Sequence, residues 1–324
     1  MRAIQLVLFL SFLSFLNPCL VISNFQNDKC TPQDNTTYMF AYSNDIAPES
    51  IFEVLNYMKK GYPVARQFVK FARVLFDVQQ PEEIKYHDSL NELILDANNS
   101  LPDPRLSYSS ISEGSDVISV LEKFLKNTKF PICGSRINFL VKRLPTEVDV
   151  KSIVAKLKKF HVEVYFGISE NFIGGNTFDA LNEIAFRTNG MLMFLKDESL
   201  FMGVFSTQHY TKETLIYATN FNVSGQGTVE LPPMTIPFRA GQWFIMSFKD
   251  DPVSDAFQSA TITCTNTITD KSFIYEYTIT NTGLVNFIRR TTLWDEGIYT
   301  MKLEYKYANQ DVERLFIRIR TTDT

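Results

Sequence analysis

The chain has 324 residues, of which 45% are hydrophobic and 21% charged, and its formal net charge is -4. This length and apolar content favour two domains with separate cores and exclude a chain that is disordered throughout. The acidic balance lacks the basic footprint of a protein that binds phosphate backbones, so we expect no nucleic acid partner.

Residues 1–23 have the pattern of a secretory signal peptide. A positive charge at Arg2 precedes an apolar run over residues 4–16, which is the order of such a signal. A membrane-spanning helix is the alternative, but it needs about 20 apolar residues, and Asn17-Pro18 interrupts the run near its end. We therefore expect a secreted, extracellular protein without a membrane span, whose mature chain begins near Asn24.

From Tyr38 to about Lys196 the pattern alternates between strands and helices. In the first helix, apolar residues recur at helical spacing, with Pro48 near the start and Gly61 just past the end. Strands alternating with helices of this length predict a mainly parallel sheet covered on both faces. The predicted strands are 37–42, 68–76, 137–144, 162–168 and 191–195, and the predicted helices are 48–60, 115–125, 149–160 and 178–185.

The sequence pattern changes beyond Asp197, where the alternation of strands and helices ends. Residues 198–212 indicate a short terminal helix and linker, and from residue 213 onwards Gly, Pro and Thr separate short apolar runs. Seven or eight strands of even spacing predict an antiparallel β-sandwich. The stretch Asp295-Glu296-Gly297-Ile298-Tyr299 resembles the tyrosine corner of immunoglobulin-like domains, which implies an immunoglobulin-like sandwich over residues 213–324.

The first half of the mature chain carries a further resemblance. The strand and loop YMFAYSND (38–45), and later HVEVYFGIS (161–169) and FDALNEIAFRTNGMLMFL (178–195), stand in an order that resembles a von Willebrand A-like domain. The match covers roughly half of the mature chain. The whole chain is similar to secreted nematode proteins that pair a degenerate A-like domain, residues 24–197 in this sequence, with a C-terminal β module. This resemblance implies a doubly wound sheet ordered 3-2-1-4-5-6, with ligands bound outside the carboxyl ends of the strands.

The metal site of such a domain is degenerate in this chain. Intact members hold a divalent cation with an Asp-x-Ser-x-Ser loop, a Thr from a second loop and an Asp after the fourth strand. The first loop reads Ala41-Tyr42-Ser43-Asn44-Asp45, Ser110 or Ser112 could stand for the Thr, and the fourth strand ends in Lys142-Arg143-Leu144-Pro145. A hard dication needs anionic oxygen ligands, so we predict no metal and no cofactor. The remnant of the site comprises Ser43, Asp45 and Ser112.

Secretion would place Cys30, Cys133 and Cys264 in an oxidising compartment. In the implied sheet order the first and fourth strands are parallel neighbours, and Cys30 and Cys133 precede them, so the resemblance predicts a disulfide between these two. Two reduced thiols are the alternative. Cys264 shares the core-facing side of its strand with Ile262. It is therefore expected to be a buried free thiol, or else to form an intermolecular bridge. Predicted N-glycosylation sites are Asn35, Asn98 and Asn222.

Catalytic motifs are scarce. His87, His161 and His209 have no acid or cysteine at a metal-ligand or triad-like spacing, and Gly167-Ile168-Ser169 lacks the second glycine of a nucleophile elbow. We therefore predict a non-enzymatic, metal-independent recognition or adhesion protein for an extracellular protein or glycan, and the resemblance adds a role in host defence. The alternative is a secreted enzyme of unrecognised class acting on glycans or peptides. The predicted binding face comprises Tyr42, Ser43, Asn44 and Asp45.

Overall fold

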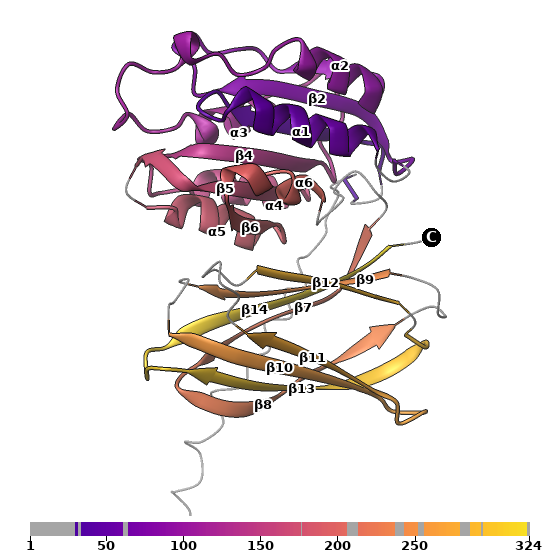
Figure 1. Ribbon diagram of the computed structural model, residues 1–324. Helices are drawn as coiled ribbons and strands as arrows, with labels where there is room; N and C mark the ends of the chain where they lie inside the picture. The colour runs from indigo at the N-terminus through magenta and orange to yellow at the C-terminus, as the bar shows by residue number, and fades with distance from the viewer. Residues whose placement is uncertain are drawn as a thin grey trace, which may run out of the picture. The chain divides into compact units, whose positions relative to one another are not determined.

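The computed structural model of the protein describes residues 30–31, 34–60, 64–175, 177–205, 213–236, 243–251, 256–278, 286–292 and 294–322 (Figure 1). The predicted signal peptide, residues 1–23, lies outside this part of the chain. No helix within it combines the length and the apolar character that a bilayer crossing requires.

The first domain is built on a six-stranded sheet with the order β3-β2-β1-β4-β5-β6. All neighbouring strands are parallel except β2 and β3, which pair antiparallel. This order confirms the mainly parallel, doubly wound sheet predicted from the sequence. The strands are β1 (Thr36–Ser43), β2 (Phe68–Phe76), β3 (Lys85–His87), β4 (Arg136–Leu144), β5 (Glu163–Gly174) and β6 (Met191–Leu195).

Helices cover both faces of this sheet, as the alternating pattern requires. Alternate residues of β1 point to opposite cores: Met39 and Ala41 pack with α3, α4 and α5, whereas Tyr38, Phe40 and Tyr42 pack with α1 and α2. Every residue of β1 is buried, which places this strand at the centre of the domain. The helices are α1 (Pro48–Lys59), α2 (Leu90–Asn98), α3 (Val117–Leu125), α4 (Lys151–Lys159), α5 (Asp179–Arg187) and the short α6 (Met202–Phe205).

Two elements lie in a stretch whose pattern predicted neither. Strand β3 has only three residues, and helix α2 buries only Leu93 and Ala97, so neither produces a clear apolar periodicity. Ser89 caps α2 by accepting a hydrogen bond from the backbone N–H of Glu92, and the Glu92 carboxylate accepts one from the N–H of Asp88, the residue before the cap. The spacing of Ser89 and Glu92 is the sequence signal that reveals this helix.

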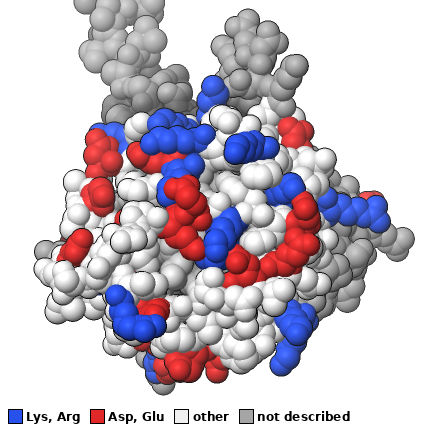
Figure 2. Space-filling view, turned by 90° about the horizontal axis from the view of Figure 1, so that it is seen from above, with Lys and Arg blue, Asp and Glu red and all other residues white. Residues whose placement is uncertain are grey.

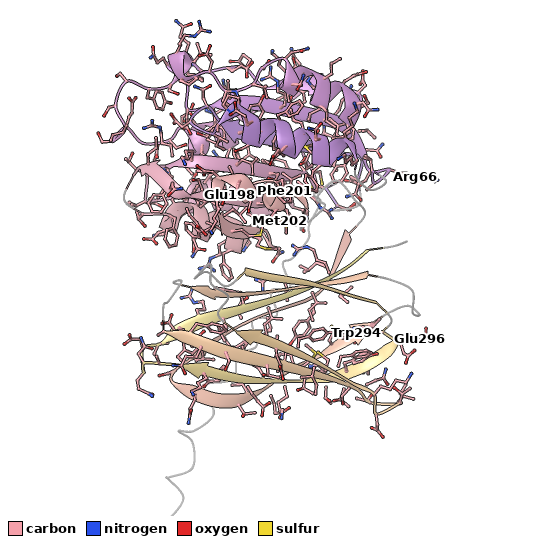
Figure 3. The ribbon with its side chains drawn as sticks, viewed as in Figure 1. Arg66, Glu198, Phe201, Met202, Trp294 and Glu296 are labelled. Atoms are coloured by element: carbon pink, nitrogen blue, oxygen red, sulfur yellow. The ribbon has the colours of Figure 1, made fainter. Side chains whose placement is uncertain are left out.

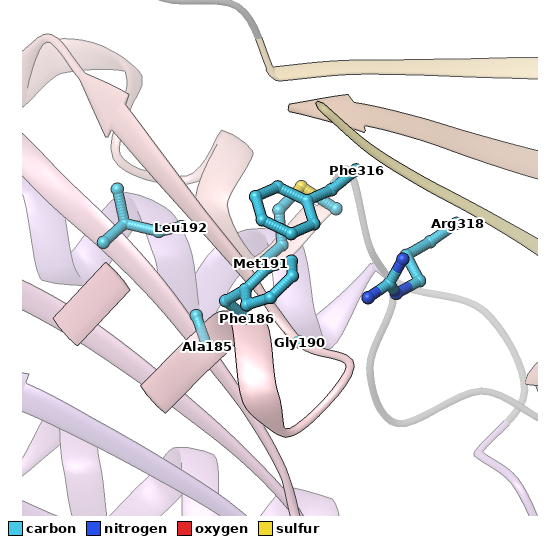
Figure 4. Close-up of a pocket in the computed structure, with 7 residues that line it drawn as sticks. All are labelled: Ala185, Phe186, Gly190, Met191, Leu192, Phe316 and Arg318. Carbon is cyan, nitrogen blue, oxygen red and sulfur yellow. The ribbon is translucent and has the colours of Figure 1, made fainter. Parts of the chain in front are cut away.

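The turn between α5 and β6 shows why glycine follows Asn189. A Cβ atom on Gly190 would lie 1.7 Å from the carbonyl oxygen of Val164 on β5, so only glycine allows this approach of the backbones. Asn189 itself has a φ of 59°, a conformation that Asn tolerates better than most residues. Figure 4 labels Gly190 at this turn, close to Phe186 of α5. The turn therefore ends the helix where the sequence predicted.

The second domain is a sandwich of two four-stranded antiparallel sheets, ordered β11-β10-β13-β8 and β12-β9-β14-β7. The pairing is nested: β10 pairs with β11, β9 with β12, β8 with β13 and β7 with β14. The strands are β7 (Glu213–Val223), β8 (Gln226–Ile236), β9 (Trp243–Asp251), β10 (Phe257–Asn266), β11 (Ser272–Thr278), β12 (Asn286–Thr292), β13 (Gly297–Tyr307) and β14 (Glu313–Thr322).

Nested pairing of this kind is the arrangement of a jelly roll. An immunoglobulin sandwich instead pairs its first strand with its second, whereas β7 and β8 lie in different sheets. The immunoglobulin-like order predicted from the sequence is therefore not found. The tyrosine corner that suggested it is nevertheless formed, because the Tyr299 hydroxyl donates a hydrogen bond to the Asp295 carbonyl over 2.8 Å. The tyrosine corner is a local hydrogen bond within residues 295–299 and does not determine the order of the strands.

The core of the sandwich surrounds Trp294 (Figure 3). The indole stacks on Phe273, with ring centroids 4.8 Å apart, and its Nε1 donates to the Tyr275 hydroxyl over 3.1 Å. Cys264 lies in the same core as a buried free thiol, which confirms one of the two outcomes left open by the sequence. Burial raises the pKa of this thiol to about 12, so it is held in its neutral, unreactive form.

The structure also gives the bonding of Cys30 and Cys133 and the exposure of the predicted glycosylation sites. Cys30 and Cys133 are both disulfide-bonded, as the predicted link between them requires. The sequon asparagines Asn35, Asn98 and Asn222 are exposed, a position that an attached glycan needs.

Candidate functional site

The carboxyl end of β1 carries the predicted binding face, but three of its four residues are buried. The Tyr42 hydroxyl donates to the carbonyl of Ser100 over 2.9 Å. Asn44 donates to the Asp103 carbonyl over 2.8 Å and accepts from the Asp103 N–H over 2.9 Å. Tyr42, Ser43 and Asn44 are at most 2% exposed, so they support the surrounding loops instead of forming a contact surface. The predicted face is corrected on this ground.

Asp77 is the polar centre beneath these loops, a residue that the sequence motifs did not single out. It follows β2 directly, is fully buried and has a φ of 61°. Ser43 and Ser115 donate their hydroxyls to its two carboxylate oxygens over 2.5 and 2.6 Å. Its own N–H donates to the Asp116 carboxylate over 2.9 Å. An acid immediately after an apolar strand was the signal available in the sequence.

Burial governs the ionisation of this pair of acids. It raises the pKa of Asp77 to about 8, with smaller contributions from the charges of Asp116 and Asp45 that act against the two serine hydrogen bonds. Burial also raises the pKa of Asp116. Two carboxyl groups so close together in a dry site favour retention of a proton.

Arg143, at the end of β4, places a cation at the degenerate metal site. Its side chain is 1% exposed, and its Nε donates to the Asp45 carboxylate over 2.8 Å. Its Nη1 donates to the carbonyls of Ser110 and Glu113 over 3.0 and 2.6 Å. Tyr108 covers the guanidinium, with 5.3 Å from its ring centroid to Cζ. Arg143 therefore ties the loop before α3 to the carboxyl ends of β1 and β4.

The degenerate metal residues do not come together as a ligand set. Asp45 donates its N–H to the Ser43 hydroxyl over 3.3 Å, but Ser112 is exposed and bonds to Ser110. Ser115, not Ser110 or Ser112, joins Ser43 at Asp77. Among the described residues no group of three or more His, Cys, Asp or Glu is placed to hold a metal ion. With the Arg143 charge against Asp45, these residues do not fit a divalent cation.

We expect titration of the purified protein with magnesium or manganese chloride to give no saturable heat, because the Arg143 guanidinium already neutralises Asp45. Isothermal titration calorimetry on protein first treated with a chelator measures this. A saturable micromolar signal that disappears in a Ser43→Ala variant would contradict it.

A serine and a lysine meet at a second polar cluster near the ends of β4 and β5. The Lys142 ammonium donates to the Ser169 hydroxyl over 2.9 Å and to the Asp197 carboxylate over 2.6 Å, and Ser169 donates to Asp197. A serine beside a lysine is one arrangement of nucleophile and base. Ser169, however, is fully buried and also accepts the Asn171 N–H. The cluster therefore joins β4 and β5 to Asp197, which follows β6.

Three segments above this polar layer form one surface, which we call the loop face. The Gly174 N–H donates to the Ile111 carbonyl over 2.9 Å, and the Ser115 N–H donates to the Leu144 carbonyl over 3.0 Å. Gly175 lies so close to the chain at Pro145 that an added Cβ would be 2.0 Å from that carbonyl oxygen. The segments are residues 107–116, residues 145–150, and the described residues 170–175 and 177–178 of a third segment, 170–178.

Three of the exposed large apolar side chains in the described part of the chain belong to the loop face. Ile111 is 76% exposed, Val148 74% and Phe172 41%. Phe172 reaches the surface because the β4–β5 register jumps: Val141 pairs with Ile168 but Arg143 pairs with Ile173, so the residues of β5 between them bulge out. Bulges and loops on a rigid sheet are the usual carriers of binding residues.

Comparison with known proteins finds one family match, over residues 219–322, to a model described as a domain of unknown function (DUF7154). No curated protein matches the chain. The family match over residues 219–322 covers most of the jelly roll. The segments of the loop face lie outside it.

Solved structures with some likeness cover one domain at a time. Proximal thread matrix protein 1 from the mussel byssus is 10% identical with a TM-score of 0.35, and the match covers 53% of this chain and 44% of that one. The VWA domain of SpRpn10 is 15% identical (TM-score 0.33; 52% of this chain, 93% of that one). The P-domain of the Macrobrachium rosenbergii nodavirus is 18% identical (TM-score 0.23; 34% and 90%). The fold assignment rests on the strand order alone, and no activity is carried over from these proteins.

Proposed function

We propose that the protein is a non-enzymatic recognition protein that binds an extracellular protein or glycan through the loop face without a metal ion. The observation that carries this proposal is the exposure of Ile111, Val148 and Phe172. They lie on adjoining segments at the carboxyl ends of the sheet strands. Exposed apolar groups that cluster on one surface of a soluble protein are typical of interaction sites.

The layer beneath the loop face supports binding rather than catalysis. Asp77, Arg143 and Ser169 are all buried, and their polar groups bond to protein partners. Such a layer fixes the loops before a ligand arrives, which lowers the entropic cost of association. Secretion is part of the proposal and is supported by the pattern of residues 1–23 and by the disulfide-bonded Cys30 and Cys133.

A variant that replaces the three exposed apolar residues by serine is expected to lower affinity for the ligand about tenfold or more, because apolar anchors dominate interfaces. The mature protein is first screened against arrays of extracellular proteins and glycans, and each hit is then measured by biolayer interferometry. The variant is Ile111→Ser/Val148→Ser/Phe172→Ser.

The matched control replaces three exposed apolar residues elsewhere, Phe52, Leu95 and Ile274, and should leave affinity within about twofold. Equal losses in both variants, or no loss in the loop-face variant, would place the binding site elsewhere.

A further inference from the structure

We propose that the occupant of the loop face is a basic protein segment in which lysine or arginine flanks apolar residues. This inference rests on the proposed function and adds the chemistry of the partner. It follows from the charges that surround the three apolar side chains.

Acids surround the apolar residues of the loop face, and its segments contain no base. Residues 107–116, 145–150 and 170–178 include no Lys, Arg or His. Glu113, Glu147 and Asp149 are exposed and Glu170 is half-buried. The fifth acid of these segments, Asp116, belongs to the buried layer beside Asp77.

The bases that adjoin these segments in the sequence are already engaged or lie beyond the face. Arg143 is buried against Asp45, Lys142 is paired with Asp197, and Arg105 is paired with Asp103. Lys151 is exposed at the start of α4, just outside the face. Within the described part of the chain no ion pair involves Glu113, Glu147 or Glu170.

Another side of the same domain shows what a balanced surface looks like. Lys70 pairs with Asp88, and Lys123 pairs with Glu83. Figure 2, which views the domain from the α2 side at the top of Figure 1, shows basic and acidic side chains interspersed. Charges of this kind neutralise one another, whereas those of the loop face are all of one sign. The exposed acids Glu113, Glu147 and Asp149 therefore give the loop face a local negative charge.

A cluster of acids around apolar anchors selects its partner in two ways. The negative potential attracts and orients a cationic segment, and like charges repel an acidic one. Apolar side chains of the partner then bury Ile111, Val148 and Phe172, while its lysines or arginines stay at the wetter rim beside the glutamates. A neutral glycan would gain nothing from the acids, and an anionic glycan would be repelled.

The test uses a fluorescent synthetic peptide with a central leucine pair flanked by lysines, and the same peptide with glutamates in place of the lysines. Fluorescence anisotropy with the full mature chain is expected to show binding of the lysine peptide that weakens as salt rises. The variant Glu113→Gln/Glu147→Gln/Glu170→Gln is expected to bind it about tenfold more weakly. The control Glu53→Gln/Glu230→Gln/Glu276→Gln removes the same charge from exposed acids elsewhere and should bind within about twofold of the wild type.

Three results would overturn this inference: no binding of the lysine peptide, preference for the glutamate peptide, or equal losses in the two glutamine variants. Its failure is distinguishable from that of the proposed function. A ligand from the array that is lost on replacing Ile111, Val148 and Phe172, but not on replacing the glutamates, leaves the recognition role intact and excludes a basic partner.

Discussion

Replacement of Arg143 by methionine is expected to lower the free energy of unfolding of the α/β domain by about 3 to 5 kcal/mol, because it leaves a buried charge without its partner. The Asp45 side chain is only 9% exposed, so water cannot replace the guanidinium. The variant also leaves the carbonyls of Ser110 and Glu113 without their donor, which adds to the cost. Methionine keeps much of the side-chain volume, so the loss reports on charge and hydrogen bonding rather than on a cavity.

Urea unfolding followed by two probes separates the domains. Both tryptophans, Trp243 and Trp294, belong to the jelly roll, whereas the described helices belong to the α/β domain. The helical circular dichroism transition should therefore shift to lower urea while tryptophan fluorescence reports on the sandwich.

The control for this variant is Arg105→Met. The Arg105 side chain is 88% exposed and pairs with Asp103 at the surface, so its loss should change the unfolding midpoint little. The double variant Arg143→Met/Asp45→Asn removes both charges and should recover part of the stability. A shift for Arg143→Met as small as that for Arg105→Met would mean that Asp45 is not held by this arginine.

The sequence predicted most of the first domain because its elements are set by local patterns. Strand β6 and helix α1 follow from apolar periodicity with clear stop residues, and β2 was placed with the bounds it has in the structure. Short elements escaped, because β3 is only three residues long. The apolar pattern of the sequence therefore predicted the long central strands and the helices that cover them better than the short strand at the edge of the sheet.

The candidate site was harder to predict because its contacts are distant in sequence. The resemblance implied that the fourth strand ends in Lys142-Arg143-Leu144-Pro145, without the aspartate of an A-like domain. It did not show that Arg143 reaches Asp45, 98 residues away, since a sequence does not give the direction of a side chain. Asp77 was missed for a similar reason: it lies after β2, outside the motif that directed attention to Ser43. Burial of Tyr42 could have been inferred, because a central strand leaves little of its end exposed.

The second domain shows the limit of a local motif. Alternate residues of β13 face the core: Tyr299, Met301 and Leu303 are buried and Tyr305 is half-buried. Alternation assigns faces but not partners. The nested order that brings β7 against β14 depends on contacts across the whole domain, and a tyrosine corner is compatible with more than one such order.

Asp77→Asn is expected to make the α/β domain more stable than the wild type at high pH and to remove a pH dependence that the wild type shows. The pKa of Asp77 is about 8 in the folded protein, against about 3.9 in an unfolded chain. Between these values the folded state holds a proton that the unfolded state has released, so raising the pH favours unfolding. The contribution is fully present below about pH 4 and is lost as the pH rises through about 8.

The difference between the two proteins isolates Asp77, because every other titrating group is shared. From about pH 5 to pH 9 the wild type should lose several kcal/mol relative to Asp77→Asn, since each unit of pKa difference corresponds to about 1.4 kcal/mol. Asparagine tolerates the positive φ of this position and keeps an oxygen for one serine hydroxyl. Alanine does neither, so Asp77→Ala should be destabilised at every pH. Urea unfolding at several pH values measures all three; parallel curves for the wild type and Asp77→Asn would show that Asp77 is ionised throughout.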